Sequence, residues 1–369
     1  MSELENRHMP EQETECPTPE QRERIFHNIT LPTFPELTGW NLKLTALFLK
    51  EFSRELRELG IPHPQIEYVL GNRFFTREES TNDLEKYLKG LVRSVHCAMP
   101  RAEKEPTLAS KLKYSLTSPH PTFLPSWNTR GTVTDKGRLG AGLETAHAVG
   151  ARTLVMHAAE LAYLLMNKKH PEAHIPSLVE KLSDARDKIA PEVAIAIETQ
   201  GNTIAQLPRE KFEFVYNPIM LAELLHDAHT QHMGLTIDFQ HCRIHDLDPT
   251  TVVRKIEDRY PGLIQHAHVN APSSTYQDAH QSFAGSTDQK LRHQLQQFFF
   301  ALAKINFNGG LVPELDPPGT VSTHARNLIM RKIIDPARGI PYEVRAQELE
   351  EERQYLHDVI EEIHSLLEL

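Results

Sequence analysis

The chain has 369 residues, of which 39% are hydrophobic and 24% are charged, and its formal net charge is −10. Those proportions are ordinary for a soluble globular protein, and the length suits either one large α/β barrel with extra elements or two smaller domains. The negative charge weighs mildly against a nucleic-acid-binding surface, although bound divalent metals would cancel carboxylate charge locally.

The predicted strands alternate with amphipathic helical stretches after a polar N-terminal segment. Residues 1–22 carry no apolar signal core, so we expect them to be a disordered leader. The alternation predicts a parallel sheet with right-handed crossovers. In chain order, the predicted strands are Ile25–Leu31, Ile66–Leu70, Tyr114–Thr117, Thr153–Met156, Val193–Ile197, Leu235–Ile237, Leu263–Ala267 and Gly310–Pro313. A second apolar run, Val95–Met99, competes for the place of the third strand.

The predicted helices fill the intervals between these strands. They are Leu42–Leu59, Asp83–Ser94, Leu139–Val149, Ile175–Ile189, Met220–His229, Thr250–Arg259 and Asp288–Ile305. Eight strands with helices between them is the count of a closed (β/α)8 barrel, or TIM barrel, which we assign to residues 23–340. A strongly helical stretch of mixed charge follows, so residues 341–369 are expected to form an extra C-terminal helix that packs on the barrel or extends from it.

Six consecutive predicted strands end in a carboxylate or an imidazole. In a parallel barrel all the C-terminal strand ends share one face, where enzymes of this fold place their chemistry. Both groups are good ligands for zinc, manganese and related ions. The residues in question are His120, His157, Glu198, Asp238, His268 and Glu314. On the seventh strand we expect His268 to be the ligand, and His266, deeper in the strand, to be a supporting or core histidine.

Further candidate ligands lie just past the strand ends. His241 follows Asp238 by three residues, and Asp278 and His280 lie in the loop after the seventh strand. In an extended segment, residues two apart point to the same side, which suits joint coordination of one ion by Asp278 and His280. A solvated loop pair is the alternative interpretation of these two residues.

The segments around these residues resemble the xylose isomerase-like TIM barrel superfamily, also called AP endonuclease family 2, and most of all its endonuclease IV group. The matching stretches, over roughly residues 113–318, are SPHPTFL, LVMHAAE, AIAIETQGN, GLTIDFQHC, QHAHVNA and LVPELDPP. The resemblance implies up to three zinc ions at the barrel mouth. Its implied ligands are His120 and His157 for the first ion, Glu198 as a bridge, Asp238, His268 and Glu314 for the second, and His241, Asp278 and His280 for the third.

Three functional hypotheses follow. By resemblance, the chain is a zinc-dependent hydrolase of phosphodiesters of the abasic-DNA type, in which Glu198 bridges the ions or holds the attacking water. The alternative is a sugar isomerase or epimerase that acts on a small sugar or sugar phosphate, with a single Mn, Mg or Co ion and proton transfer by Glu198 and Glu314. A non-catalytic binding barrel is the third, which the density of ligand-type residues disfavours. The number of tightly bound ions separates the three.

The sequence also bears on compartment and partners. No apolar run approaches the roughly 20 residues that a membrane helix needs, so we expect no membrane partner. The three cysteines, Cys16, Cys97 and Cys242, cannot form a disulfide framework and favour a reducing, cytoplasmic setting. The sequence carries no signal for a particular oligomeric state.

Overall fold

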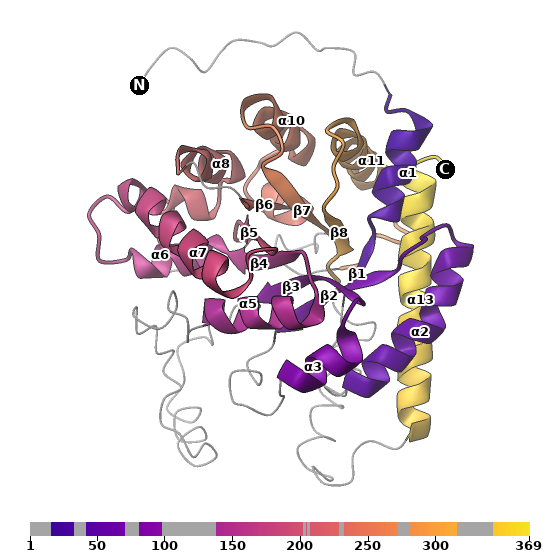
Figure 1. The fold of residues 1–369 in the computed structure, drawn as a ribbon. Coiled ribbons are helices and arrows are strands. Elements are labelled where there is room, and N and C mark those ends of the chain that lie inside the picture. The colour runs from indigo at the N-terminus through magenta and orange to yellow at the C-terminus, as the bar shows by residue number, and fades with distance from the viewer. Residues whose placement is uncertain are drawn as a thin grey trace, which may run out of the picture.

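A single parallel sheet organises the chain. The computed structural model describes residues 16–32, 42–70, 81–97, 138–201, 204, 207–228, 232–271, 281–315 and 342–369. Within them, eight parallel strands follow one another around the sheet in chain order (Figure 1). The strands are β1 (Thr30–Pro32), β2 (Gln65–Leu70), β3 (Val92–Cys97), β4 (Thr153–His157), β5 (Ala194–Glu198), β6 (Met233–Asp238), β7 (Ile264–Val269) and β8 (Gly310–Pro313). A parallel bridge between Ile29 and Leu311 brings the last strand back to the first, so the predicted (β/α)8 barrel is confirmed.

The helices surround the ring of strands. They are α1 (Pro19–His27), α2 (Leu42–Glu58), α3 (Thr81–Leu88), α5 (Arg138–Val149), α6 (Ala158–Leu164), α7 (Ile175–Ile189), α8 (Pro218–Asp227), α9 (Phe239–Ile244), α10 (Pro249–Arg259), α11 (Gln289–Lys304) and α13 (Tyr342–Leu366), with short 3-10 turns η2 (Glu172–His174) and η3 (Glu213–Val215). Helices α8, α10 and α11 begin where Asn217, Asp248 and Asp288 accept hydrogen bonds from the backbone amides of the first turn. No helix in the described part of the chain has the length and apolar content that crossing a bilayer requires.

The strands are buried on both faces, as the strands of a parallel barrel must be. Every residue of β4 and β6 is buried, and β5 is buried from Ile195 to Glu198. The outward side chains pack under the helices, while the inward ones fill the barrel. A polar side chain at the end of such a strand therefore lies in a desolvated place, which determines the chemistry of the site below.

The C-terminal helix α13 packs on the flank of the barrel, against α2 and α11 (Figure 1). One face of it is apolar and buried: Leu356, Val359, Ile360, Ile363 and Leu366. Its end is attached to α1, because Arg22 Nη1 donates a hydrogen bond to the carbonyl of Leu367 at 3.0 Å. An ion pair between Arg292 and Glu362 joins it to α11.

The structure corrects the predicted first strand. Ile25 belongs to α1, and the strand itself is only Thr30–Pro32. Helix α1 begins at Pro19, inside the segment that we expected to be a disordered leader, because Thr18 and Gln21 form a reciprocal capping box. Residues 1–15 of that leader lie outside the described residues.

The structure also corrects the predicted third strand. The third position in the ring is β3, the run that competed with Tyr114–Thr117, and β3 pairs with β2 on one side and β4 on the other. The helix expected over Asp83–Ser94 ends at Leu88, and Gly90 follows with a φ of +79°, a conformation that glycine adopts without strain. Tyr114–Thr117 lies outside the described residues. The consequence is that His96 stands near the end of the third strand.

Candidate metal centre

A compact set of carboxylates and imidazoles lies inside the mouth of the barrel, most of them at or just past the C-terminal ends of the strands. Register brings neighbouring members side by side, since His157 is paired with Glu198 and Asp238 with His268. All of them are buried except Glu314, whose side chain is 20% exposed. The members are Glu67 of β2, His96 of β3, His157 of β4, Glu198 of β5, Asp238 of β6, His241 of α9, His268 of β7 and Glu314 just after β8.

Glu198 is the hub of this set. Its Oε1 lies 3.1 Å from Nδ1 of His268 and 3.3 Å from Nδ1 of His241. Its Oε2 lies 3.4 Å from Nε2 of His96 and 3.7 Å from Nε2 of His157. One carboxylate therefore faces four imidazoles, two on each oxygen, which is an arrangement suited to holding or bridging metal ions.

The remaining carboxylates approach the same histidines from other strands. Glu314 Oε2 lies 3.2 Å from Nδ1 of His268, on the side away from β5. Asp238 Oδ1 accepts a hydrogen bond from the backbone amide of His241 at 2.6 Å, and its Oδ2 accepts one from Asn270 Nδ2 at 3.3 Å. The first of these bonds caps α9, so the same hydrogen bond fixes the start of that helix and the orientation of the Asp238 side chain.

The donor atoms form three overlapping groupings, in each of which all the atoms lie within 4.8 Å of one another. The largest contains one donor atom from each of four residues, and Glu198 and His268 recur in the smaller ones. The groupings are Glu198, Asp238, His268 and Glu314; His96, His157 and Glu198; and Glu67, His96 and His268.

Burial and mutual attraction shift the pKa values of these groups. Burial would raise the pKa of Glu198, but the charge and hydrogen bond of His268 and the other nearby histidines outweigh it and hold the pKa below its usual range. Burial raises the pKa of Asp238 to about 6, and the neighbouring carboxylates act in the same direction. Burial lowers the pKa of His157 to about 4, so this ring is neutral at pH 7, the form that binds a metal.

The donor set fits a divalent cation. Nε2 of His96 and Oε2 of Glu198, which face each other, are buried without a hydrogen bond of good geometry. Buried polar atoms are almost always partnered, so these atoms call for a further partner. A cation coordinated by carboxylates and imidazoles would supply it and would offset the repulsion between the clustered carboxylates, which are Glu67, Glu198, Asp238 and Glu314.

The structure brings most of the predicted ligands into this set and adds two residues. His157, Glu198, Asp238, His241, His268 and Glu314 lie together, whereas His120, Asp278 and His280 lie outside the described residues. The prediction missed Glu67 and His96. The signal for His96 was present in the competing run Val95–Met99, and the signal for Glu67 was an acidic residue inside an otherwise apolar predicted strand.

Comparison with known proteins agrees with the architecture. The profile of the family described as xylose isomerase-like TIM barrel matches residues 41–333. Among curated protein sequences none matches the chain. Among solved structures, the chain is similar to a xylose isomerase domain containing protein from Salmonella typhimurium, with 12% identity over 93% of this chain and 98% of that one and a TM-score of 0.50.

Other similar structures are an IolI protein with a bound zinc atom (14% identity, 90% of this chain and 98% of that one, TM-score 0.49) and the 3-keto-D-glucoside 4-epimerase YcjR from E. coli (13% identity, 82% and 97%, TM-score 0.44). Likeness at such identities shows the fold alone. The comparisons do not support the narrower assignment to the endonuclease IV group. Because the family profile matches most of the chain and the structure has the eight-stranded barrel, the chain belongs to the xylose isomerase-like TIM barrel family.

Proposed function

We propose that the protein is a divalent-metal-dependent isomerase or epimerase that acts on a small sugar or sugar phosphate. The proposal rests on one observation. Glu198 ends β5 and Glu314 follows β8, so the two residues stand on either side of the β6–β7 pair. Glu198 Oε1 and Glu314 Oε2 lie 3.1 and 3.2 Å from Nδ1 of His268. With Asp238 they form the four-residue grouping. Two glutamates thus flank one ion site, and a reaction that removes a proton from one face of a carbon next to a carbonyl and returns it to the other can use one such group on each face.

The chemistry divides between an ion and the protein. A divalent ion in the four-residue grouping would polarise adjacent carbonyl and hydroxyl oxygens of the substrate. Glu198 has a lowered pKa and is ionised at neutral pH, so one of the two glutamates is ready to accept the substrate proton. Glu314, with its side chain partly exposed, stands at the more accessible edge of the site and is placed to return the proton.

Burial of the site supports this division of roles. Glu198 and His268 are 0% exposed, so bulk water has little access to that side of the site. A site closed to bulk water strengthens the electrostatic interactions that would stabilise a deprotonated substrate, whereas Glu314, at the more accessible edge, can exchange its proton with solvent. His241, 3.3 Å from Glu198, is the residue that we expect to contact substrate hydroxyls.

A second function has one observation in its favour. The grouping of His96, His157 and Glu198 shares Glu198 with the four-residue grouping, so Glu198 is placed to bridge two ions. Many enzymes that cleave phosphate esters, such as phosphatases and nucleases, use two metal ions that lie close together. The abasic-DNA form of this hypothesis has no support among the similar structures, and the net charge of −10 opposes a polyanionic substrate.

The deciding experiment combines metal analysis with an exchange assay. Protein purified without added metal or chelator is analysed for bound ions, and ketoses, aldoses and their phosphates are incubated with it in deuterium oxide and followed by NMR. We expect one exchangeable ion per chain, deuterium incorporation next to the carbonyl of one substrate, and loss of incorporation in Glu314→Gln.

His157→Ala is the matched control, since it removes a member of the second grouping alone. Under the proposed function the variant retains its ion and its exchange activity. Two zinc ions per chain, one of them lost in His157→Ala, together with cleavage of a phosphodiester and no deuterium exchange in any sugar, would favour the second function and reject the first.

A further inference from the structure

Glu67 lies near the middle of β2, deeper in the barrel than His96 because it pairs with Ser94, two residues before His96, and it is 1% exposed. We propose that Glu67 is a positioning residue that fixes the orientation of His268 and His96, and the tautomer of His268, the histidine of the four-residue grouping. The inference rests on the metal site of the proposed function, and it is independent of the substrate.

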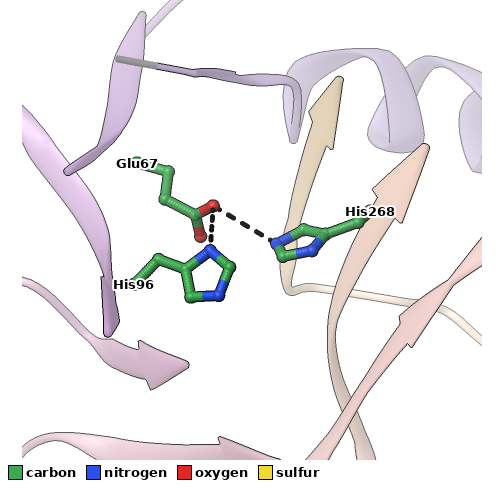
Figure 2. Close-up of side chains that lie close together, drawn as sticks. All are labelled: Glu67, His96 and His268. Atoms are coloured by element: carbon green, nitrogen blue, oxygen red, sulfur yellow. Dashed lines mark ion pairs between the residues drawn. The ribbon is translucent and has the colours of Figure 1, made fainter. Parts of the chain in front are cut away.

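The contacts of Glu67 place it behind both rings. Its Oε1 lies 3.2 Å from Nε2 of His268 and 3.5 Å from Nδ1 of His96 (Figure 2). The opposite nitrogen of each ring faces Glu198, with Nδ1 of His268 at 3.1 Å and Nε2 of His96 at 3.4 Å. Each imidazole therefore spans the distance between the deep carboxylate and the hub of the metal centre.

Imidazole chemistry turns this geometry into a role. A neutral ring carries one N–H and one lone pair, and the nitrogen that binds a metal must be the one without the proton. For His268, the proton then belongs on Nε2 and points at Glu67 Oε1. The ring of His96 is oriented by the same oxygen, which lies beside its Nδ1. A carboxylate that accepts the N–H of a metal-bound histidine holds the ring in place and increases its basicity.

The other side of Glu67 is already bonded. Its Oε2 accepts a hydrogen bond from Ser94 Oγ at 2.9 Å and lies 2.8 Å from Nε2 of His266. A second ion at Glu67 would need the Nε2 lone pair of His268, and that ring has no second lone pair to give while Nδ1 is bound. The grouping of Glu67, His96 and His268 is therefore assigned to orienting the histidines rather than to ligating an ion.

A glycine behind His266 completes the support. Gly310 is paired with His266 across β7 and β8, and a β-carbon on Gly310 would lie 2.7 Å from Cε1 of that ring. Only a residue without a side chain leaves room for His266 to stand against Glu67. Residues from β3, β7 and β8 thus fix the carboxylate of Glu67.

The test compares Glu67→Gln with Ser94→Ala in the full chain. Zinc affinity is measured by competition with a chromophoric chelator, and bound zinc is counted by elemental analysis. Loss of a partner of this kind weakens metal binding by roughly 10- to 100-fold, so we expect that loss in Glu67→Gln with the number of ions unchanged. Ser94→Ala, which leaves Oε1 and both metal-site histidines in place, is expected to bind zinc nearly as the parent chain does.

Two results would overturn the inference: unchanged zinc affinity in a folded Glu67→Gln protein, or the loss of one whole ion per chain, which would make Glu67 a ligand. If Glu67→Gln does not fold, ¹⁵N NMR of the histidine rings in the zinc-loaded parent chain decides. We expect the proton of His268 on Nε2, and the reverse tautomer refutes the role. Neither readout uses a sugar, so failure of the proposed reaction leaves this test intact, whereas a parent chain that binds neither zinc nor any other divalent ion refutes both.

Discussion

Asp238 offers a test in which one substitution is expected to act with opposite sign in the metal-free and the metal-bound protein. The residue is 0% exposed, and burial, together with the neighbouring carboxylates, raises its pKa from 3.8 to about 6. A shift of that size corresponds to about 3 kcal/mol by which the folded, metal-free protein is destabilised when Asp238 is ionised. Asp238→Asn removes the charge and retains an oxygen to cap α9.

The pH dependence follows from the raised pKa. Because the folded state holds this proton more tightly than the unfolded state, the cost is absent below about pH 4 and complete above about pH 6. Without metal, Asp238→Asn is therefore expected to be more stable than the parent chain by up to about 3 kcal/mol near neutral pH. The difference is expected to shrink steadily as the pH is lowered toward 4.

The assay is urea unfolding of both proteins, with excess chelator and with excess zinc, at neutral pH and at a moderately acidic one. A ligand at 100 times its Kd stabilises the folded state by about 2.7 kcal/mol, a gain that a chain lacking one metal ligand loses in large part. With excess zinc, the difference in unfolding free energy that favours Asp238→Asn over the parent chain should therefore become smaller or change sign. A metal-free Asp238→Asn protein that is less stable than the parent chain at neutral pH would refute the reasoning, since the buried charge would then have no net cost.

Other perturbations probe the centre and its support. Gly310→Ala is expected to destabilise the fold by about 1–3 kcal/mol in urea unfolding, because the added carbon lies against the ring of His266; unchanged stability would show that the ring has room. Ile363→Ala on α13, at a fully buried site, is expected to cost about 2–5 kcal/mol, whereas Glu361→Ala on the exposed face of the same helix should cost little. Zinc affinity, measured by competition with a chelator, is expected to rise as the pH rises through neutrality. Burial lowers the pKa of His268, but the nearby carboxylates outweigh it and raise the pKa, and the ring must lose a proton before it binds zinc. An affinity that does not change with pH would contradict this expectation.

The later strands were predictable because their signals are local. From β4 onward each strand is an apolar run of ordinary length, with a helix of clear period before the next, and the structure agrees within a few residues. The strand-end residues Glu198, Asp238 and His268 follow from those boundaries, because parallel strands deliver their ends to one face.

The early part of the barrel could not be predicted in the same way. β1 has only three residues, too few for a periodic signal, and the capping box at Thr18 is a stronger local cue than any strand pattern nearby. The third strand depended on which of two apolar runs pairs with β2 and β4, and pairing is a non-local property. The role of Glu67 could not be predicted from its neighbours in the sequence, because its partner His266 lies 199 residues away.

The placement of α13 has a consequence for how the chain folds. The helix covers the join between the first and last strands, since it contacts α2, which follows β1, and α11, which precedes β8. The hydrogen bond from Arg22 to Leu367 joins residues 345 positions apart, so the ring is secured by contacts of very high contact order. Such contacts form late, because closing a long loop costs entropy before any contact compensates for it. During synthesis the join between β1 and β8 lacks the cover of α13 until that helix has been made, and over that interval this part of the barrel is more exposed to misassembly.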